Sequence, residues 1–146
     1  MESHFKVSPM LGQIQTNKIM KAAKAQMNKL LRPYGISSLY FPFILQLYFN
    51  ESMTLKELNE ALGVDKAHTT RAIKDLKKKG YVYDDRKTPK ALKYKLYLTN
   101  EGTELALYLK SVVDRFEKSL SEALSQEEIK TLVSLHEKIL AAINNI

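Results

Sequence analysis

The chain has 146 residues, of which 23 are Lys or Arg and 16 are Asp or Glu, giving a net charge of +7. This length fits one domain with helical extensions, and 45% hydrophobic residues are enough for a core. The absence of cysteine excludes disulfides, thiolate metal sites and cysteine-based redox sensing. The most apolar run, residues 39–49, is too short to span a membrane, and the first residues do not resemble a signal peptide. We therefore expect a cytoplasmic protein that has no membrane partner.

The positive charge is concentrated in one segment. Residues 54–98 contain 12 Lys or Arg and 6 Asp or Glu, so this segment carries +6 of the net +7. A locally basic segment is typical of a nucleic-acid-binding surface, although a solvated lysine-rich face gives the same charge pattern. The motifs within the segment favour the first interpretation.

Two helices are predicted before the basic segment. Apolar residues recur at mostly helical spacing from Leu11 to Leu31, and Arg32-Pro33-Tyr34-Gly35 ends that helix. Ser37 is expected to cap a second helix, which carries a cluster of aromatic residues and has Pro42 near its first turn.

The basic segment opens with two short helices. Thr54 and Glu57 have the spacing of a capping box, and Gly63 supplies a left-handed end to the helix that they open. Asp65 can cap a second helix, which Gly80 closes. Two short helices joined by a tight glycine-containing turn form a helix-turn-helix pattern. The predicted core positions of the second helix are Thr69, Ala72, Ile73 and Leu76.

A β-hairpin and two longer helices follow. Residues 81–83 and 94–98 alternate in polarity and flank a polar, basic tip, so they predict the hairpin known as a wing. Thr99 can cap one long helix, and Ser125 with Glu128 forms a capping box for the last. Apolar stripes on the terminal helices have no obvious partner inside a compact winged helix, so we expect a homodimer. The expected interface residues are Ile14, Val113, Ile129, His136, Ile139 and Ile143.

The stretch TLKELNEALGVDKAHTTRAIKDLKKKGYV, with the wing and Leu98-Thr99-Asn100-Glu101-Gly102 after it, closely resembles the MarR family of bacterial and archaeal regulators. The resemblance extends in element order over nearly the whole chain. It implies a mainly α (α+β) fold, a winged helix-turn-helix with N- and C-terminal dimerisation helices. It further implies a single domain over residues 1–146, with dimerisation helices at about 1–34 and 100–146 and a DNA-binding lobe at about 36–98.

The resemblance places the helix at residues 65–79 in the major groove of duplex DNA. Thr69 is counted both among the core positions and among the DNA contacts. For Arg71 the alternative role is an internal salt bridge to Asp75, four residues on. The expected DNA contacts are Lys66, His68, Thr69, Thr70, Arg71 and Lys74 on this helix and Arg86, Lys87 and Lys90 on the wing.

The wing departs from the family pattern at one point. Members of the family usually carry an Asp-x-Arg-like pair there, whereas the corresponding stretch of this chain is Thr88-Pro89-Lys90-Ala91-Leu92-Lys93. We expect one of Arg86, Lys87 or Lys90 to replace the arginine that would enter the minor groove.

The expected function is that of a sequence-specific repressor that binds a pseudo-palindromic operator as a homodimer and is released by an effector. Family members bind small organic or aromatic acids, which implies a pocket here, although the same aromatic residues would serve as ordinary core. The three histidines are scattered and no catalytic motif stands out, so we expect no metal, no cofactor and no enzyme activity. The alternative function is a winged-helix module for protein–protein contact or a subunit of a transcription assembly. The expected pocket residues are Tyr34, Tyr40, Phe41, Phe43 and Tyr48.

Overall fold

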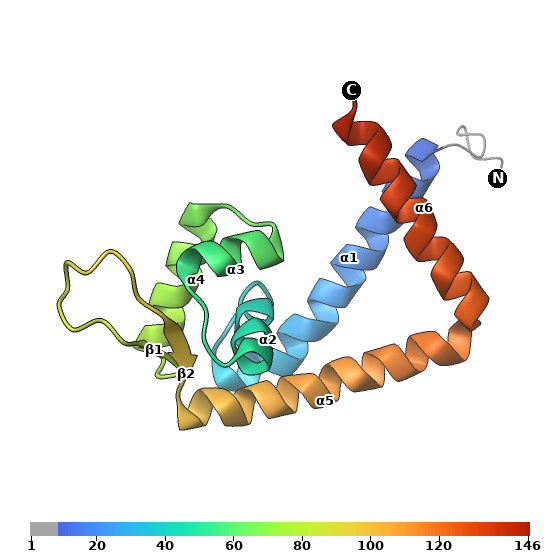
Figure 1. Cartoon of the computed structure of the whole chain (residues 1–146). Coiled ribbons are helices and arrows are strands. Elements are labelled where there is room, and N and C mark those ends of the chain that lie inside the picture. Colours follow the sequence, from blue (N-terminus) through green and yellow to red (C-terminus); the bar gives the residue numbers. More distant parts are fainter. Residues whose placement is uncertain (1–8) are drawn as a thin grey trace. The chain divides into compact units, whose positions relative to one another are not determined.

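The computed structural model describes residues 9–146, and it divides the chain into two compact units, Met1–Thr103 and Glu104–Ile146. The first unit contains α1 (Pro9–Leu31), a short 3₁₀ helix η1 (Arg32–Tyr34), α2 (Phe41–Asn50), α3 (Leu55–Leu62), α4 (Lys66–Lys78), β1 (Val82–Asp84) and β2 (Leu96–Leu98). Helix α5 (Asn100–Ala123) crosses the boundary, and α6 (Gln126–Asn144) lies in the second unit. This order of elements confirms the expected mainly α, winged helix-turn-helix fold (Figure 1).

Capping residues determine where α3 and α4 begin. The Glu57 amide donates to the Thr54 hydroxyl over 3.1 Å, and the Thr54 amide donates to the Glu57 carboxylate over 2.8 Å. The Asp65 carboxylate accepts from the His68 amide over 2.7 Å at the start of α4. Because these groups satisfy amides that have no partner inside the helix, the two short helices begin where the sequence predicts. Gly63, at a φ of 62°, ends α3 in the left-handed conformation that glycine adopts without steric cost.

The start of α2 differs from the prediction. Tyr40, not Ser37, is its N-cap residue, and Ser37 instead closes a preceding turn through its backbone carbonyl, which accepts from the Tyr40 amide over 3.0 Å. Pro42 therefore lies within the first turn, where its missing amide hydrogen breaks no helical hydrogen bond. The helix runs from Phe41 to Asn50 and buries Phe43, Ile44 and Leu47.

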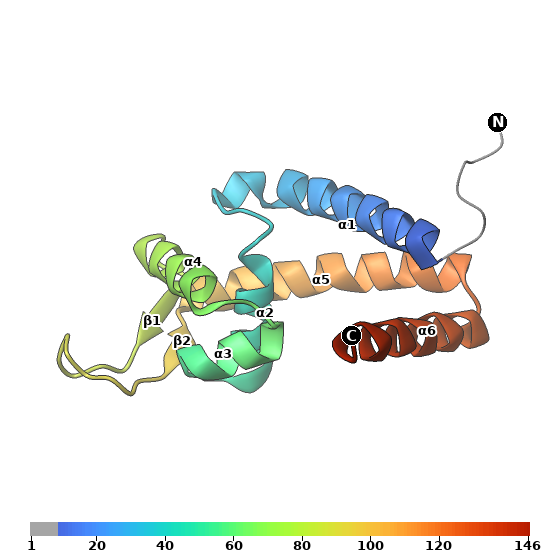
Figure 2. The same ribbon diagram turned by 90° about the horizontal axis from the view of Figure 1, so that it is seen from above.

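The wing is a short antiparallel hairpin. β1 pairs with β2 over three residue pairs, from Val82 opposite Leu98 to Asp84 opposite Leu96. Met53 adds an isolated bridge to Leu96 and so joins the residues before α3 to the same sheet. The loop between the strands extends away from α3 and α4, as two perpendicular views show (Figures 1 and 2).

The Leu-Thr-x-x-Gly stretch after the wing has a steric explanation. A Cβ atom on Gly102 would lie 2.0 Å from the backbone oxygen of Tyr81, so only glycine fits there. The Thr99 hydroxyl donates to the Gly80 carbonyl over 2.6 Å and accepts from the Gly102 amide over 3.0 Å. Thr99 therefore caps α5, as predicted, and also fastens the start of that helix to the end of the helix-turn-helix.

The core of the first unit is formed by the middle helices and the hairpin. Side chains from α2, α3, α4 and β2 are 1% exposed or less, among them Phe43, Leu58, Leu76 and Leu96. In the second unit, the Ser125–Glu128 capping box opens α6 as predicted. None of the helices described, from residue 9 onward, combines the length and the apolar character that crossing a membrane requires.

Candidate nucleic-acid interface

Helix α4 has one buried and one exposed face. Ala72, Ile73 and Leu76 are at most 3% exposed, as the predicted core positions require. Because successive residues of a helix are rotated by about 100°, the side chains on the opposite side of the helix point away from the core. The exposed polar side chains on this outer face include Lys66, Thr70, Arg71 and Lys74. The helix therefore presents several cations and a hydroxyl on the side that the core leaves free.

Thr69 corrects one of the predictions. Its side chain is fully buried, and its hydroxyl donates to the Asp65 carbonyl over 3.3 Å. A buried hydroxyl with an internal acceptor is not available to DNA. Thr69 is therefore a core residue and not a DNA contact.

His68 and Thr70 keep part of their polar surface available. The His68 ring is half-buried and stacks on Phe43, with ring centroids 5.7 Å apart. The Thr70 hydroxyl donates to the Lys66 carbonyl over 2.8 Å, which leaves its oxygen free to accept. Within residues 9–146, no group of three His, Asp or Glu side chains is placed to hold a metal ion, at His68 or elsewhere.

The structure does not show the salt bridge from Arg71 to Asp75 that was the alternative role for Arg71. Asp75, its predicted partner, instead accepts a 2.6 Å hydrogen bond from the Tyr40 hydroxyl of the segment before α2. This bond to a carboxylate raises the pKa of Tyr40, and burial adds to the effect. Arg71 itself is exposed, so its guanidinium is available for a ligand.

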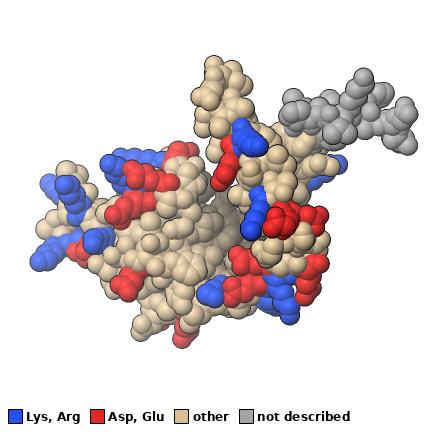
Figure 3. Space-filling view, turned by 45° about the vertical axis from the view of Figure 1, so that its right-hand side comes forward, with Lys and Arg blue, Asp and Glu red and all other residues tan. Residues whose placement is uncertain are grey.

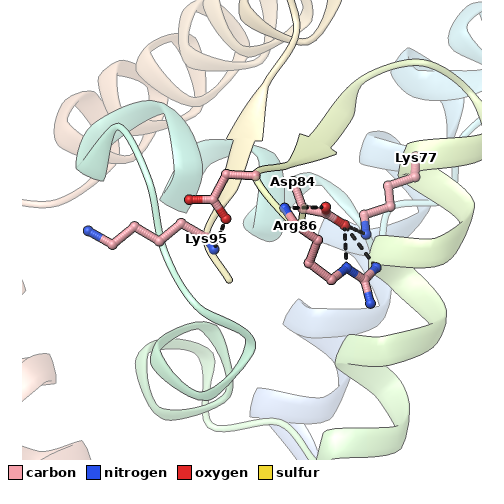
Figure 4. A network of polar contacts seen from close by, with 5 residues as sticks. Lys77, Asp84, Arg86 and Lys95 are labelled. Atoms are coloured by element: carbon pink, nitrogen blue, oxygen red, sulfur yellow. Dashed lines mark hydrogen bonds and ion pairs between the residues drawn. The ribbon is translucent and has the colours of Figure 1, made fainter. Parts of the chain in front are cut away.

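The wing arginine is held by a network that the sequence analysis did not find. Asp84, at the end of β1, accepts from Arg86 Nη2 over 2.8 Å and from Arg86 Nε over 3.1 Å. The same carboxylate oxygen pairs with Lys77 Nζ of α4 (Figure 4). The Arg86 guanidinium also lies 4.0 Å from the centroid of the Tyr94 ring, on the returning arm of the wing. The hydrogen bonds from Arg86, together with Lys77, hold the pKa of Asp84 well below its ordinary value.

A signal for this network is present in the sequence. Asp84-Asp85-Arg86 is an Asp-x-Arg triplet, but it stands at the beginning of the wing rather than at its end. The expectation that Arg86 takes over the role of the missing arginine agrees with its placement in the wing but remains a prediction. Lys87 and Lys90 are exposed and have no ion pair among the interactions of the described residues.

A basic groove of about 910 Å³ lies between the wing, α3 and the first residue of α4. The described residues that line it include five cations and no carboxylate. Three of the cations, Lys66, Arg86 and Lys90, were among the predicted DNA contacts. Figure 3 shows Lys and Arg side chains gathered at the end of the molecule where the wing protrudes. The cations that line the basic groove are Lys56, Lys66, Arg86, Lys90 and Lys93.

The aromatic residues predicted for an effector pocket are distributed over several contacts. Phe43 is 1% exposed and belongs to the core, as the alternative interpretation predicted. Tyr40 is bonded to Asp75, and the ring of Tyr48 lies edge-on to Phe49. The Tyr34 carbonyl accepts from the Tyr81 hydroxyl over 3.4 Å, and Phe41 is half-buried. None of the five lines the basic groove.

The residues predicted for the dimer interface are at least partly accessible. On α6, Ile139 is 43% and Ile143 is 54% exposed, and His136 is exposed as well. Ile14, Val113 and Ile129 are half-buried. Further apolar side chains of the same helix are also at least 45% exposed among the residues described, so α6 presents an apolar surface. They are Leu132, Val133, Leu135 and Leu140.

Comparison with known sequences points to one family. The sequence model of the MarR family matches residues 34–89, which include the helix-turn-helix, β1 and the first residues of the wing loop. The HTH-type transcriptional regulator YdgJ of Bacillus subtilis (strain 168), itself uncharacterised, is 30% identical over 112 residues. That alignment covers 77% of this chain and 68% of YdgJ.

Solved structures share the fold. The MarR protein from Peptoclostridium difficile DA00132 is 25% identical, with a TM-score of 0.80 over 99% of this chain and 94% of that one. A mutant of MarR from E. coli, complexed with operator DNA, is 25% identical, with a TM-score of 0.72 over 89% of this chain and 93% of that one.

Proposed function

The chain belongs to the MarR family of DNA-binding transcriptional regulators, which are not enzymes, and from this premise we propose that it is a homodimeric repressor of a pseudo-palindromic operator. The observation that carries the proposal is the exposed face of α4, where Lys66, Thr70, Arg71 and Lys74 stand clear of the core. The operator complex of the similar E. coli protein supports the same use of the fold.

The side chains of α4 divide into two roles. Arg71 is exposed and unpaired with Asp75, so it can donate two parallel hydrogen bonds to guanine in the major groove. Lys66 and Lys74 present single point charges that suit phosphates and fix the register of the helix. Thr70 and the accessible edge of His68 supply further polar contacts.

The basic groove would follow the phosphodiester backbone between α4 and the wing. Five cations line it, so phosphates entering it meet no opposing carboxylate among the lining residues. Lys87 and Lys90 at the exposed part of the wing extend the same positive surface towards the minor groove. If each protomer neutralises about 4 phosphates, the dimer neutralises about 8, and the logarithm of affinity falls against that of salt with a slope of about −7.

The proposal is tested with duplexes that the protein selects from a random-sequence library, measured by fluorescence anisotropy. We expect a pseudo-palindromic consensus and a slope of about −7 against salt. Arg71→Ala should weaken binding by about 1–3 kcal/mol and relax the preference at one base pair, because a bidentate base contact is lost. Lys18→Ala, which removes an exposed cation from α1, serves as the control. A chain that selects no duplex, or binds with no dependence on salt, would instead support a protein–protein module.

Release by an effector forms the last part of the proposal. Two contacts connect the residues around the start of α2 to α4, which is the recognition helix of this proposal: Tyr40 with Asp75, and Phe43 with His68. A small aromatic acid that displaced either ring would therefore shift α4 against α2. Salicylate and 4-hydroxybenzoate are suitable probes, and a tenfold or larger loss of operator affinity at millimolar concentration would support the idea. Unchanged affinity with both would count against an aromatic acid as the effector.

A further inference from the structure

An acidic side chain stands at the root of the wing, inside the most basic segment of the chain. Asp84 ends β1, and its side chain is only 13% exposed. Like charges repel, so a carboxylate in this position opposes the approach of DNA phosphates. If Asp84 nevertheless favours DNA binding, it must do so through its contacts within the protein.

Asp84 connects α4 to the wing, whose own two strands are joined by only three residue pairs. Its carboxylate binds Lys77 from α4 and Arg86 from the outgoing arm of the wing. The Arg86 amide also donates to Asp84 Oδ1 over 3.0 Å, so the backbone of the outgoing arm is held as well as its side chain. Figure 4 shows both cations converging on this one carboxylate.

Tyr94 brings the returning arm into the same cluster. Its ring centroid lies 4.0 Å from the Arg86 guanidinium and 5.4 Å from Lys77 Nζ. Without the carboxylate, Lys77 and Arg86 would be two like charges facing one ring, and their repulsion would push the wing away from α4. The cluster therefore links both arms of the wing to α4.

We propose that Asp84 is a positioning residue for DNA recognition, which holds the wing at the angle to α4 that allows both to engage one duplex. This inference rests on the proposed function. It predicts that removing the negative charge of Asp84 weakens DNA binding. Repulsion from the phosphates alone would predict the opposite change in affinity.

The neighbouring Asp85 offers a matched control. It is exposed, it carries the same charge at nearly the same place, and its carboxylate accepts from the Lys95 amide over 2.8 Å. An asparagine at this position keeps an oxygen that can accept this bond, so Asp85→Asn removes charge without removing the contact. Asp84→Asn removes the charge that two cations share.

The experiment compares wild type, Asp84→Asn and Asp85→Asn on the selected duplex at one fixed salt concentration. We expect Asp85→Asn to bind as tightly as wild type or more tightly, and Asp84→Asn to bind about tenfold more weakly, the cost of one lost contact. In a hydroxyl-radical footprint, Asp84→Asn should lose the protection due to the wing and keep that of the recognition helix.

The inference is overturned if Asp84→Asn binds at least as tightly as Asp85→Asn, or if its footprint weakens uniformly. Should Asp84→Asn fail to fold by circular dichroism, Lys77→Met tests the same link, because it removes the partner that α4 contributes to the Asp84 carboxylate. Wild-type affinity and an intact wing footprint of Lys77→Met would then overturn the inference. If wild type itself selects no duplex, the proposed function fails instead, so the two failures are distinguishable.

Discussion

At the scale of single residues, two adjacent threonines of α4 show how the helical rotation assigns roles. Thr69 is fully buried and its hydroxyl bonds to the Asp65 carbonyl, whereas Thr70 is exposed with its oxygen free to accept. Both have the same chemistry and the same intrinsic helix propensity. Only their position relative to the core distinguishes a stabilising residue from one available to a ligand.

This pair gives a prediction about stability and affinity. Thr69→Ala should lower the free energy of unfolding by about 1–2 kcal/mol, because it removes a buried hydrogen bond and leaves a small cavity. The folded fraction should still bind DNA as wild type does. Thr70→Ala should leave stability within about 0.5 kcal/mol of wild type and weaken DNA binding several-fold. Urea unfolding and anisotropy with the selected duplex measure the two effects. If Thr70→Ala lowered stability and Thr69→Ala lowered only DNA affinity, the assignment of the two faces of α4 would be wrong.

At the scale of secondary structure elements, the helix-turn-helix is largely determined locally and the wing is not. Capping boxes and glycine ends are encoded within a few residues, so α3 and α4 begin where the sequence predicts. The wing has only three residue pairs and a long basic loop. In the proposal above its direction depends on the Asp84 carboxylate, which pairs with Lys77 from a separate element, α4.

The pH dependence of stability tests the Asp84 cluster. Because the pKa of Asp84 is lowered in the folded chain, its contribution to stability is complete above the unfolded pKa of about 4. It is lost as the pH falls below that value and through the lower folded pKa. The difference in unfolding free energy between wild type and Asp84→Asn should thus be constant from pH 5 to about pH 8 and shrink below about pH 4.

Urea denaturation at a series of pH values checks this expectation, with Asp85→Asn, which removes one carboxylate from the same loop, measured alongside. A difference that stays constant down to about pH 2 would mean that the charge of Asp84 does not stabilise the fold.

At the scale of the whole molecule, α6 presents an apolar surface that is exposed in the part of the chain that the structure describes. Leu132, Val133, Leu140 and Ile143 are all at least 45% exposed, although they lie on a helix of 19 residues with a well-formed capping box. Exposed apolar side chains in such a row mark an interface. On α1, Ile19 and Met20 are likewise more than 60% exposed. A second copy of the chain is the occupant that the MarR-family assignment favours.

Substitution within this surface gives the last prediction. Ile139→Glu should convert a species of twice 16.7 kDa into one of 16.7 kDa in light scattering, because a buried, unpaired carboxylate would oppose association. Lys138→Glu, on the neighbouring exposed position, should leave the dimer intact. The Ile139→Glu monomer should also have about half the salt slope in DNA binding, since one protomer contacts half as many phosphates. A wild type that is monomeric at all concentrations would contradict the proposed homodimer.

The sequence by itself determined the order of the elements, the ends of α3 and α4, the start of α6, the core face of α4 and the family. These depend on capping, glycine conformation and helical periodicity, which act over a few residues. The tertiary structure alone decided that Thr69 is unavailable, that Asp75 bonds to Tyr40 and not to Arg71, and that Asp84 joins Lys77, Arg86 and Tyr94. Those outcomes depend on how a hairpin and three helices pack, because side chains from separate elements meet only once the chain has folded.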